Sequence, residues 1–180
     1  IFSSTYRRPN CCAPGKDCIL KLTMSINLRP YRPDEFLKSA EIREIKGEDA
    51  LKRWRGRVEK SGTWDDHYFH LAIEVDGELV GDLQLRHCQQ AMPPGALELG
   101  LEITPEMQGK GIGTETLKLA AVRFFNEGAH RISGSTHISN FGMIRAFEKA
   151  GWKKEGIQRG LFNDEGVLQD YVSYSILNSD

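Results

Sequence analysis

A strand, a glycine-rich loop and a helix follow one another between residues 97 and 128, and this succession constrains the fold more than any other feature. Within 97–103, leucine or isoleucine alternates with Glu or Gly, which predicts a strand with one buried and one polar face. Thr104-Pro105 ends this strand. Apolar residues then recur at helical spacing as far as Gly128, at Leu117, Ala120, Ala121, Phe124 and Phe125. The strand therefore enters an amphipathic helix through a tight loop.

The remaining patterns predict one α/β domain, with helices on both faces of a mixed sheet. Asp76-Gly77 is a strong two-residue turn that joins strands expected at 68–75 and 79–85. Asp34 is expected to cap the first helix. A closing hairpin is expected through Asn163-Asp164-Glu165-Gly166. Further helices are expected at 34–45, 49–58 and 140–150, and further strands at 26–29, 131–137, 152–158 and 168–176.

The overall composition fits a soluble globular domain. Of 180 residues, 39% are hydrophobic and 27% are charged, and no apolar run is long enough to span a membrane. The 24 lysines and arginines are balanced by 25 acidic residues, which gives a net charge of −1. This balance disfavours binding to nucleic acid or to an anionic membrane as the main function. The short basic run at 52–57 is interpreted as a solvated helix face.

Residues 1–23 are expected to be a leader, disordered or non-native, ahead of a domain at 24–180. The leader holds Cys11, Cys12 and Cys18 and more basic than acidic residues, so the remaining body is mildly acidic. Neither the cysteine spacing nor the five histidines match a metal-ligand pattern, and no metal site is expected. The lack of a secretory apolar stretch indicates a cytoplasmic protein.

The loop Gln108-Gly109-Lys110-Gly111-Ile112-Gly113 is the sharpest chemical signal. Glycines that alternate at a helix entrance let the backbone approach a ligand and direct N–H groups outward, and the helix dipole adds positive potential. Phosphate suits such a loop. A nucleoside-triphosphate loop is unsupported, because Gly95 and Gly100 at that spacing are followed by Leu101. A dinucleotide fingerprint is a distant alternative, because Thr114 occupies the place of its third glycine.

Residues 97–115 resemble motif A of the GNAT N-acetyltransferase superfamily, especially its branch of ribosomal-protein and spermidine N-acetyltransferases. Asn140 and the stretch 144–152 are similar to a later helix of the family and the strand start that follows it. Residues 155–174 are similar to its last hairpin, and the whole resemblance covers 26–177. It implies a single GNAT-type α/β domain, with a mixed sheet of about seven strands, about four flanking helices and a splay between strands four and five.

The resemblance also implies acetyl-CoA as the cosubstrate. Its pyrophosphate would lie on backbone N–H groups of 108–114, and its pantetheine arm would pair with the backbone of 101–103. Asn140 would bond to this arm or act only as a helix N-cap, and Phe147 would pack against the cofactor. The residues expected to bind it are Leu101, Glu102, Ile103, Gln108, Gly109, Lys110, Gly111, Ile112, Gly113, Thr114, Asn140 and Phe147.

Acetyl transfer to an amine requires a base, a polarised carbonyl and a protonated leaving group. An amine like that of lysine has a pKa of about 10.4, so a proton must be removed. Glu98 matches the acidic strand position of the family and is the first candidate for the base, and Glu102 on the same face is the second. Phe147 replaces a tyrosine that donates a proton in many members. The acid is left open between Tyr171, Tyr174, a hydroxyl on strand five and water.

We expect an N-acetyltransferase that acts directly on a primary amine: a protein N-terminus, a polyamine or an aminoglycoside-like compound. Asp65 and Asp66 would attract a cationic acceptor, or they form an ordinary loop. Cys88 lies outside the motif, so no covalent enzyme intermediate is expected. A homodimer is compatible with this function. The alternative is a non-catalytic acyl-CoA sensor of the same fold, favoured by the missing tyrosine.

Overall fold

The computed structural model describes residues 24–65, 67–88 and 94–180. Residues 1–23, which were expected to be a leader and hold three cysteines, and also Asp66, lie outside the described residues. The elements follow in the order β1 (Ile26–Arg29), the 3-10 helix η1 (Pro33–Glu35), α1 (Phe36–Ile42), α2 (Glu48–Glu59), β2 (Tyr68–Val75), β3 (Glu78–His87), β4 (Ala96–Ile103), the 3-10 helix η2 (Pro105–Met107), α3 (Ile112–Asn126), β5 (Arg131–His137), α4 (Phe141–Lys149), β6 (Lys153–Asp164) and β7 (Val167–Leu177).

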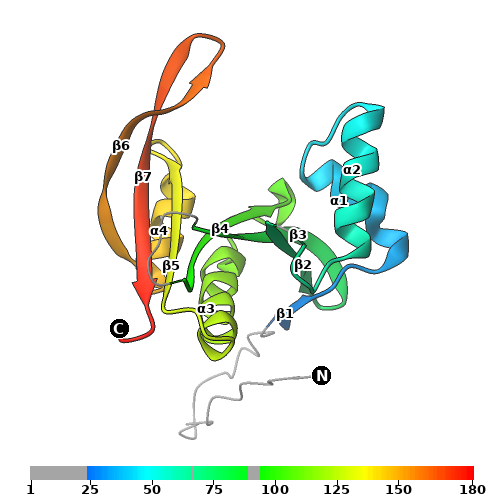
Figure 1. Cartoon of the computed structure of the whole chain (residues 1–180), viewed down its shortest axis with the longest axis horizontal. Coiled ribbons are helices and arrows are strands. Elements are labelled where there is room, and N and C mark those ends of the chain that lie inside the picture. The colour runs from blue at the N-terminus through cyan, green and yellow to red at the C-terminus, as the bar shows by residue number, and fades with distance from the viewer. Residues whose placement is uncertain (1–23, 66, 89–93) are drawn as a thin grey trace, which may run out of the picture.

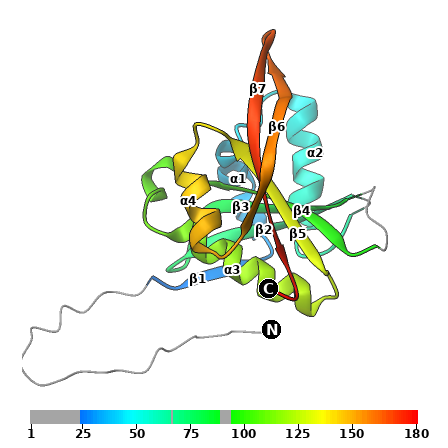
Figure 2. The same ribbon diagram turned by 90° about the vertical axis from the view of Figure 1, so that its left-hand side faces the viewer.

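The strands form one seven-stranded sheet in the order β1-β2-β3-β4-β5-β7-β6 (Figure 1). β4 and β5 run parallel, and every other neighbouring pair is antiparallel. α1 and α2 pack on one face of the sheet, and α3 and α4 pack on the other (Figures 1 and 2). The expected single α/β domain with a mixed sheet and helices on both faces is therefore confirmed.

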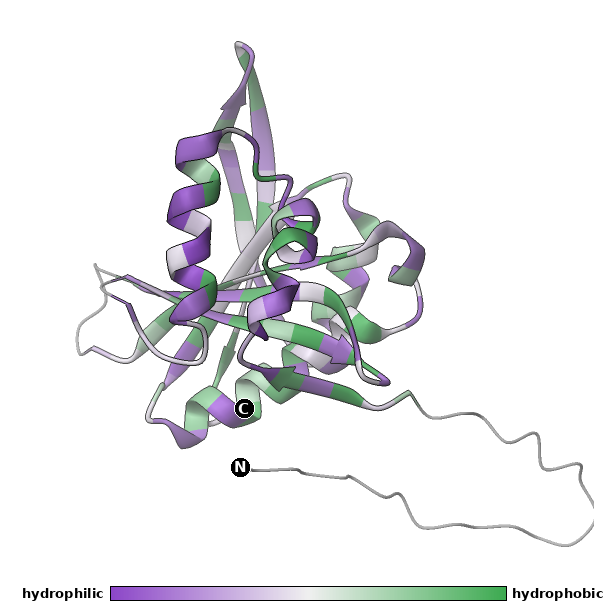
Figure 3. Cartoon of the chain, turned by 90° about the vertical axis from the view of Figure 1, so that its right-hand side faces the viewer, coloured by the Kyte–Doolittle hydropathy of each residue, from purple (hydrophilic) through white to green (hydrophobic). Residues whose placement is uncertain are grey.

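Two buried clusters hold these layers together. The larger joins Leu97 and Leu99 of β4 to Leu117 and Phe124 of α3, so the predicted buried faces of this strand and helix are confirmed. The smaller packs α1 and α2 against the opposite face around Trp54, which is 1% exposed. The outward side of α2 is hydrophilic (Figure 3). Each helix pair therefore has its own core on its own side of the sheet.

The start of the first helix differs from the expectation. A 3-10 turn at Pro33–Glu35 precedes α1, which ends at Ile42. Glu35, the last residue of this turn, provides the hydrogen bond at its start, because its Oε2 accepts the backbone N–H of Arg32 at 2.8 Å. The expectation that Asp34 caps the first helix is therefore wrong.

The closing hairpin is longer than expected. β6 and β7 remain paired as far as Asp164 and Val167, so only Glu165-Gly166 forms the turn. Both turn residues have a positive φ, at 47° and 90°, which suits a two-residue hairpin. The hairpin projects beyond the rest of the sheet (Figure 1).

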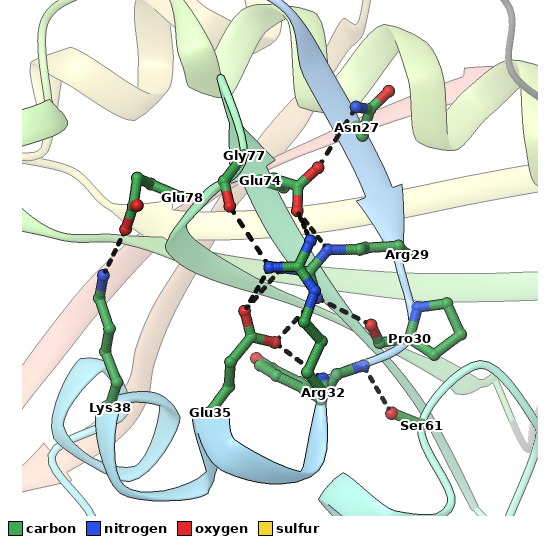
Figure 4. Close-up of polar contacts among 11 residues, drawn as sticks. Asn27, Arg29, Pro30, Arg32, Glu35, Lys38, Ser61, Glu74, Gly77 and Glu78 are labelled. Atoms are coloured by element: carbon green, nitrogen blue, oxygen red, sulfur yellow. Dashed lines mark hydrogen bonds and ion pairs between the residues drawn. The ribbon is translucent and has the colours of Figure 1, made fainter.

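A network of ion pairs fixes the chain where it enters α1 (Figure 4). Arg29 on β1 donates to Glu35 at 2.6 Å and to Glu74 on β2 at 2.5 Å, and Arg32 donates to Glu74 at 2.7 Å. Burial would raise the pKa of the Glu35 and Glu74 carboxyls, but the hydrogen bonds and charges of the two arginines hold both pKa values below the ordinary range. The network ties β1 and β2 to the 3-10 turn.

Glu74→Gln should lower the free energy of unfolding by about 2 kcal/mol near neutral pH, because both arginines lose their shared carboxylate. A carboxyl with a depressed folded pKa stabilises the fold above its unfolded pKa of about 4.3, and this stabilisation disappears as pH falls through the lowered folded pKa. Urea denaturation across this pH range should show the difference from wild type shrinking in acid. Glu78→Gln, at an exposed ion pair with Lys38, is the control with little effect. A difference independent of pH would contradict the prediction.

Candidate active site

The site begins where two neighbouring strands part. β4 is paired with β3 from Leu97 to Ile103, and β5 is paired with β7 from Arg131 to His137. β4 and β5 pair with each other only through Ala96–Glu98 on the β4 side. Beyond that point, their facing backbone groups lack a strand partner and must bind water or a ligand. The splay that the family resemblance implies between strands four and five is therefore present.

A cleft of about 1050 Å³ lies where β4 and β5 separate. Its walls come from β4, the loop after it, the first turn of α3, β5 and α4, with the end of α1 at one side. All the residues expected to bind the cofactor line it except Lys110, which is exposed and donates to Met107 Sδ at 3.4 Å. The fold therefore brings the expected binding residues to one place, although they come from a strand, a loop and two helices.

The glycine loop presents backbone donors to this cleft. Gly109 and Gly111 have φ values of 74° and 85°, and Gly111 is the N-cap of α3. A Cβ atom added at either glycine would meet nothing within 4 Å, so the space before the loop is open. The Glu115 N–H bonds to the Gly111 carbonyl, and the helical N–H groups before it have no intrahelical acceptor. Gln108 ties the loop to β4 through a 2.9 Å bond to the Ile103 carbonyl. The loop therefore fits a phosphate.

Asn140 and Phe147 form the α4 side of the cleft. Asn140 caps α4, because its Oδ1 accepts the backbone N–H of Met143 at 3.1 Å, and this leaves the amide nitrogen as a donor. Phe147 is 1% exposed and stacks on Tyr174 with ring centroids 5.0 Å apart. A Cβ at Gly134 of β5 would lie 3.0 Å from the Phe147 ring. Phe147 is thus fixed between its own helix and strand β5.

Glu98 lies outside the residues that line the cleft, where β4 is still paired with β5. Its register partner on β5 is Ser133. Its carboxylate accepts two hydrogen bonds from Arg86 of β3, at 2.5 and 3.0 Å. The role of Glu98 as base stays a prediction, and it requires an acceptor that reaches the paired end of the strand.

Glu102 is on the same face of β4 but lines the cleft. Burial raises the pKa of its carboxyl, and the neighbouring carboxylates of Asp82 and Glu44 act in the same direction, whereas Arg43 opposes them. The Arg43 Nη2 atom lies 3.9 Å from Glu102 Oε1. A raised pKa brings a carboxylate closer to the range in which it can take a proton from an amine.

Arg43 is held at the wall of the cleft by a buried carboxylate. Its Nη1 donates to Asp82 at 2.5 Å. Asp82 is fully buried, accepts the Tyr31 hydroxyl at 2.6 Å and lies 3.3 Å from His70 Nδ1. Burial would raise the pKa of Asp82, but the hydrogen bond from His70 and the charge of Arg43 lower it. Asp82 therefore stays ionised and positions Arg43.

Sequence comparisons agree with this geometry. Residues 31–152 match the profile of the acetyltransferase (GNAT) family. The chain belongs to this family. YjcK of Bacillus subtilis, a probable N-acetyltransferase, is 32% identical over 134 residues, which make up 72% of this chain and 70% of the relative. This GNAT chain is accordingly an acyltransferase.

Solved structures share the fold of this GNAT domain at low sequence identity. Ribosomal-protein-S5-alanine acetyltransferase from Vibrio fischeri gives a TM-score of 0.70 at 18% identity and covers 86% of this chain and 94% of its own. A mutant of the spermidine N-acetyltransferase SpeG from Vibrio cholerae has a TM-score of 0.70 at 20% sequence identity, and the match covers 86% of this chain and 94% of SpeG. RimJ from Mycobacterium smegmatis, in complex with CoA-disulfide, has a TM-score of 0.68 at 20% sequence identity, and the match covers 86% of this chain and 82% of RimJ. These similarities confirm the GNAT fold.

The two tyrosines considered as the acid lie apart from the cleft of this GNAT domain. Tyr174 is buried, and its hydroxyl donates to Glu148 Oε1 at 3.3 Å. Tyr171 is half-buried on the same strand. Neither tyrosine is among the cleft-lining residues in the described part of the chain. β5 instead brings Ser135 and Thr136 to the cleft, and both carry a hydroxyl.

Asp65 stabilises its own loop. Its Oδ1 accepts the backbone N–H groups of His67 at 3.0 Å and Tyr68 at 2.6 Å. Burial would raise the pKa of Asp65, but these hydrogen bonds lower it. This geometry fits the ordinary-loop alternative, and attraction of a cationic acceptor by Asp65 stays a prediction.

Arg43, Gln84 and Ser135 also line the cleft, although none of them was predicted by residue from the sequence. A signal for Gln84 exists, because Asp82 and Gln84 alternate with leucines and so share one face of their strand. That face lies beside the face of β4 that carries Glu102. Arg43 has no such signal, because it follows the end of a helix whose position depends on tertiary contacts.

No group of three or more histidine, cysteine or acidic side chains is placed to hold a metal ion among residues 24–65, 67–88 and 94–180. Within those ranges, no helix combines the length and the apolar character needed to cross a membrane.

Gly111→Val should abolish the thermal stabilisation of the protein by coenzyme A, because the new side chain would fill the open space before α3. Gly128→Val is the matched control, since Gly128 follows the other end of α3, has a φ of 99° and also faces open space. Both variants carry backbone strain, but only one of them blocks the loop. The readout is the shift in Tm at saturating coenzyme A. Equal loss of this shift in both variants would contradict a ligand at the loop.

Proposed function

We propose that this GNAT domain transfers the acetyl group of acetyl-CoA directly to a primary amine in the cytoplasm. One observation carries the proposal: a single cleft joins a phosphate-type loop at the start of α3 to an ionisable carboxylate, Glu102, on β4. Cofactor and acceptor chemistry would thus meet between the diverging strands. The complex of RimJ with CoA-disulfide supports coenzyme A as the ligand of such a cleft.

The residues present fit acetyl-CoA, which when bound supplies the acetyl group as an activated thioester. The backbone N–H groups of 109–114 would hold its pyrophosphate, with the positive end of the α3 dipole behind them. Backbone groups of Leu101–Ile103 that face away from β3 would pair with the pantetheine arm. The Asn140 amide would donate to the same arm, and Phe147 would pack beside it.

Glu102 is the residue that we assign as the general base. It lies in the cleft, burial raises its pKa, and Arg43 at 3.9 Å favours its ionised form. Glu98 is four residues away along the strand, or about 13 Å, so the two carboxylates cannot both contact one acceptor nitrogen. Glu98 remains the alternative base if the acceptor enters near Arg86.

The cleft also offers groups for the other two requirements of acyl transfer. Outward N–H groups on the unpaired part of β4 are preorganised donors for a carbonyl oxygen that gains negative charge. The hydroxyls of Ser135 and Thr136 on β5 can hand a proton to a leaving thiolate and recover one from solvent. These roles do not need a tyrosine at the position of Phe147.

The names of two fold neighbours support two classes of acceptor amine. An acetyltransferase named for an alanine of a ribosomal protein and one named for spermidine support a protein N-terminus or a polyamine, and an aminoglycoside-like amine is a third class. Exposed Ile157, Phe162 and Leu168 on the β6–β7 hairpin support a homodimer.

The second candidate function is a non-catalytic acyl-CoA sensor, which is favoured by Phe147 in place of a proton donor.

Glu102→Gln should reduce kcat about 100-fold or more, because the amine would lose its base. Glu98→Gln should change kcat much less, since Glu98 is engaged with Arg86 outside the cleft. The assay is release of the CoA thiol from acetyl-CoA with an alanine-initiated peptide, spermidine and an aminoglycoside. Loss of activity only in Glu98→Gln would move the base to Glu98. Coenzyme A binding without turnover of any amine would favour the sensor.

Arg43→Gln should shift the acid limb of the pH profile of kcat/KM to higher pH. Removal of the cation next to Glu102 disfavours the carboxylate, so the pKa of Glu102 rises and more of it is protonated at a given pH. Arg86→Gln is the matched control, because its partner Glu98 lies outside the cleft. Tm values establish that both variants are folded. An unmoved acid limb in Arg43→Gln would contradict Glu102 as the titrating base.

A further inference from the structure

A second hollow of about 340 Å³ opens beside the cleft. It lies between the end of α1, the connection that follows and one side of α2. Four cationic side chains line it together with Trp54, namely Arg43, Lys46, Arg53 and Arg57, and we call this space the basic hollow. Arg43 and Glu44 line both spaces, so the basic hollow and the cleft share a wall.

Some basic residues of α2 line the basic hollow and others do not. Arg53 and Arg57 are four residues apart and therefore project from the same side of the helix into the hollow. Arg55 lies elsewhere, with its guanidinium 4.0 Å from the centre of the Phe36 ring. Arg53 and Arg55 are both exposed, as expected of a solvated helix face, but Arg53 and the half-buried Arg57 also line the hollow.

Among the described residues, three of the four cations of the basic hollow have no ion-pair partner, whereas the fourth, Arg43, is paired with Asp82. In the described parts of the chain, Lys46, Arg53 and Arg57 take part in no ion pair, whereas Arg29 and Arg32 each contact two carboxylates. Glu44 is the one carboxylate that lines the hollow. Like charges gathered around a concave surface repel one another and attract an anion.

The floor of the basic hollow is rigid. Trp54 is 1% exposed, and its Nε1 donates to the buried Ser39 hydroxyl at 2.9 Å. Arg57 is held with its guanidinium 4.4 Å from the centre of the Tyr68 ring. Arg43 is held by buried Asp82. An anion would therefore meet two arginines, Arg43 and Arg57, that other contacts already hold, which lowers the entropic cost of binding.

We infer that the basic hollow binds a carboxylate or phosphate group carried by the acceptor while the acceptor's amine reaches Glu102. Arg43 links the two positions, since it lines the hollow and lies 3.9 Å from the Glu102 carboxylate. The preferred acceptor is then an amine with a negative charge nearby, such as a peptide whose N-terminal residue is followed by Asp or Glu. A polyamine would be repelled. This inference rests on the proposed function and narrows its substrate class.

Binding is tested first with inorganic phosphate, read as stabilisation of the full chain in thermal melts. Saturating coenzyme A is present throughout to occupy the glycine loop. Arg53→Gln should weaken the apparent affinity for phosphate about tenfold, the loss expected from one charge-assisted hydrogen bond. Arg55→Gln, on the same helix but outside the hollow, should retain wild-type affinity. No phosphate effect, or the same loss in both variants, would overturn the inference.

The acceptor role is tested with two peptides that begin with alanine and differ only in Glu or Gln at the second and third positions. The wild type should show a kcat/KM about tenfold higher for the Glu peptide, and the preference should disappear in Arg53→Gln but persist in Arg55→Gln. Equal turnover of both peptides, or higher kcat/KM for spermidine, would overturn this inference and leave acetyl transfer intact. Failure of every amine to react would instead contradict the proposed function.

Discussion

β4 and β5 are neighbours in the sheet, yet each is bonded along its length to a different strand, β3 in one case and β7 in the other. The two strands are paired with each other only near Ala96–Glu98. Their separation beyond that point leaves the pairing of β4 with β3 and of β5 with β7 intact. Gly134 of β5 allows a close approach at the point where the strands begin to part, because a Cβ there would come within 3.1 Å of the Leu99 carbonyl and 3.0 Å of the Phe147 ring. Unpaired backbone on β4, followed at once by the glycine loop, gives the cleft its binding groups.

In the proposed function, each side of the sheet has its own role. The α3 and α4 side contributes the helix N-terminus, Asn140 and Phe147, which suit a long phosphorylated cofactor. The α1 and α2 side contributes Arg43 and the basic hollow, which suit the acceptor. Asp82 connects the sheet to the acceptor side, because it is buried in β3 and holds Arg43. Glu102 stands between the two sides.

The segment from Leu97 to Gly128 was predictable because its signals are local: the alternation of the strand, the glycines and the helical spacing lie within about thirty residues. The position of α1 was not, because Arg43 meets Asp82 across 39 positions of sequence. The choice between Glu98 and Glu102 was equally out of reach. They share a face by periodicity, but the point where β4 leaves β5 decides which one lies in the cleft, and that point depends on the pairing of β5 with β7.

Amide hydrogen exchange, resolved by residue in NMR spectra with and without coenzyme A, tests the central claim that the open edge of β4 and the start of α3 form the binding surface. Amides of 101–103 that face away from β3, and those of 109–114, should exchange at least about tenfold more slowly with coenzyme A bound. Amides of Ala96–Glu98, already between two strands, should change little. Unchanged exchange at the loop and at the open edge of β4, despite saturating coenzyme A, would contradict the account.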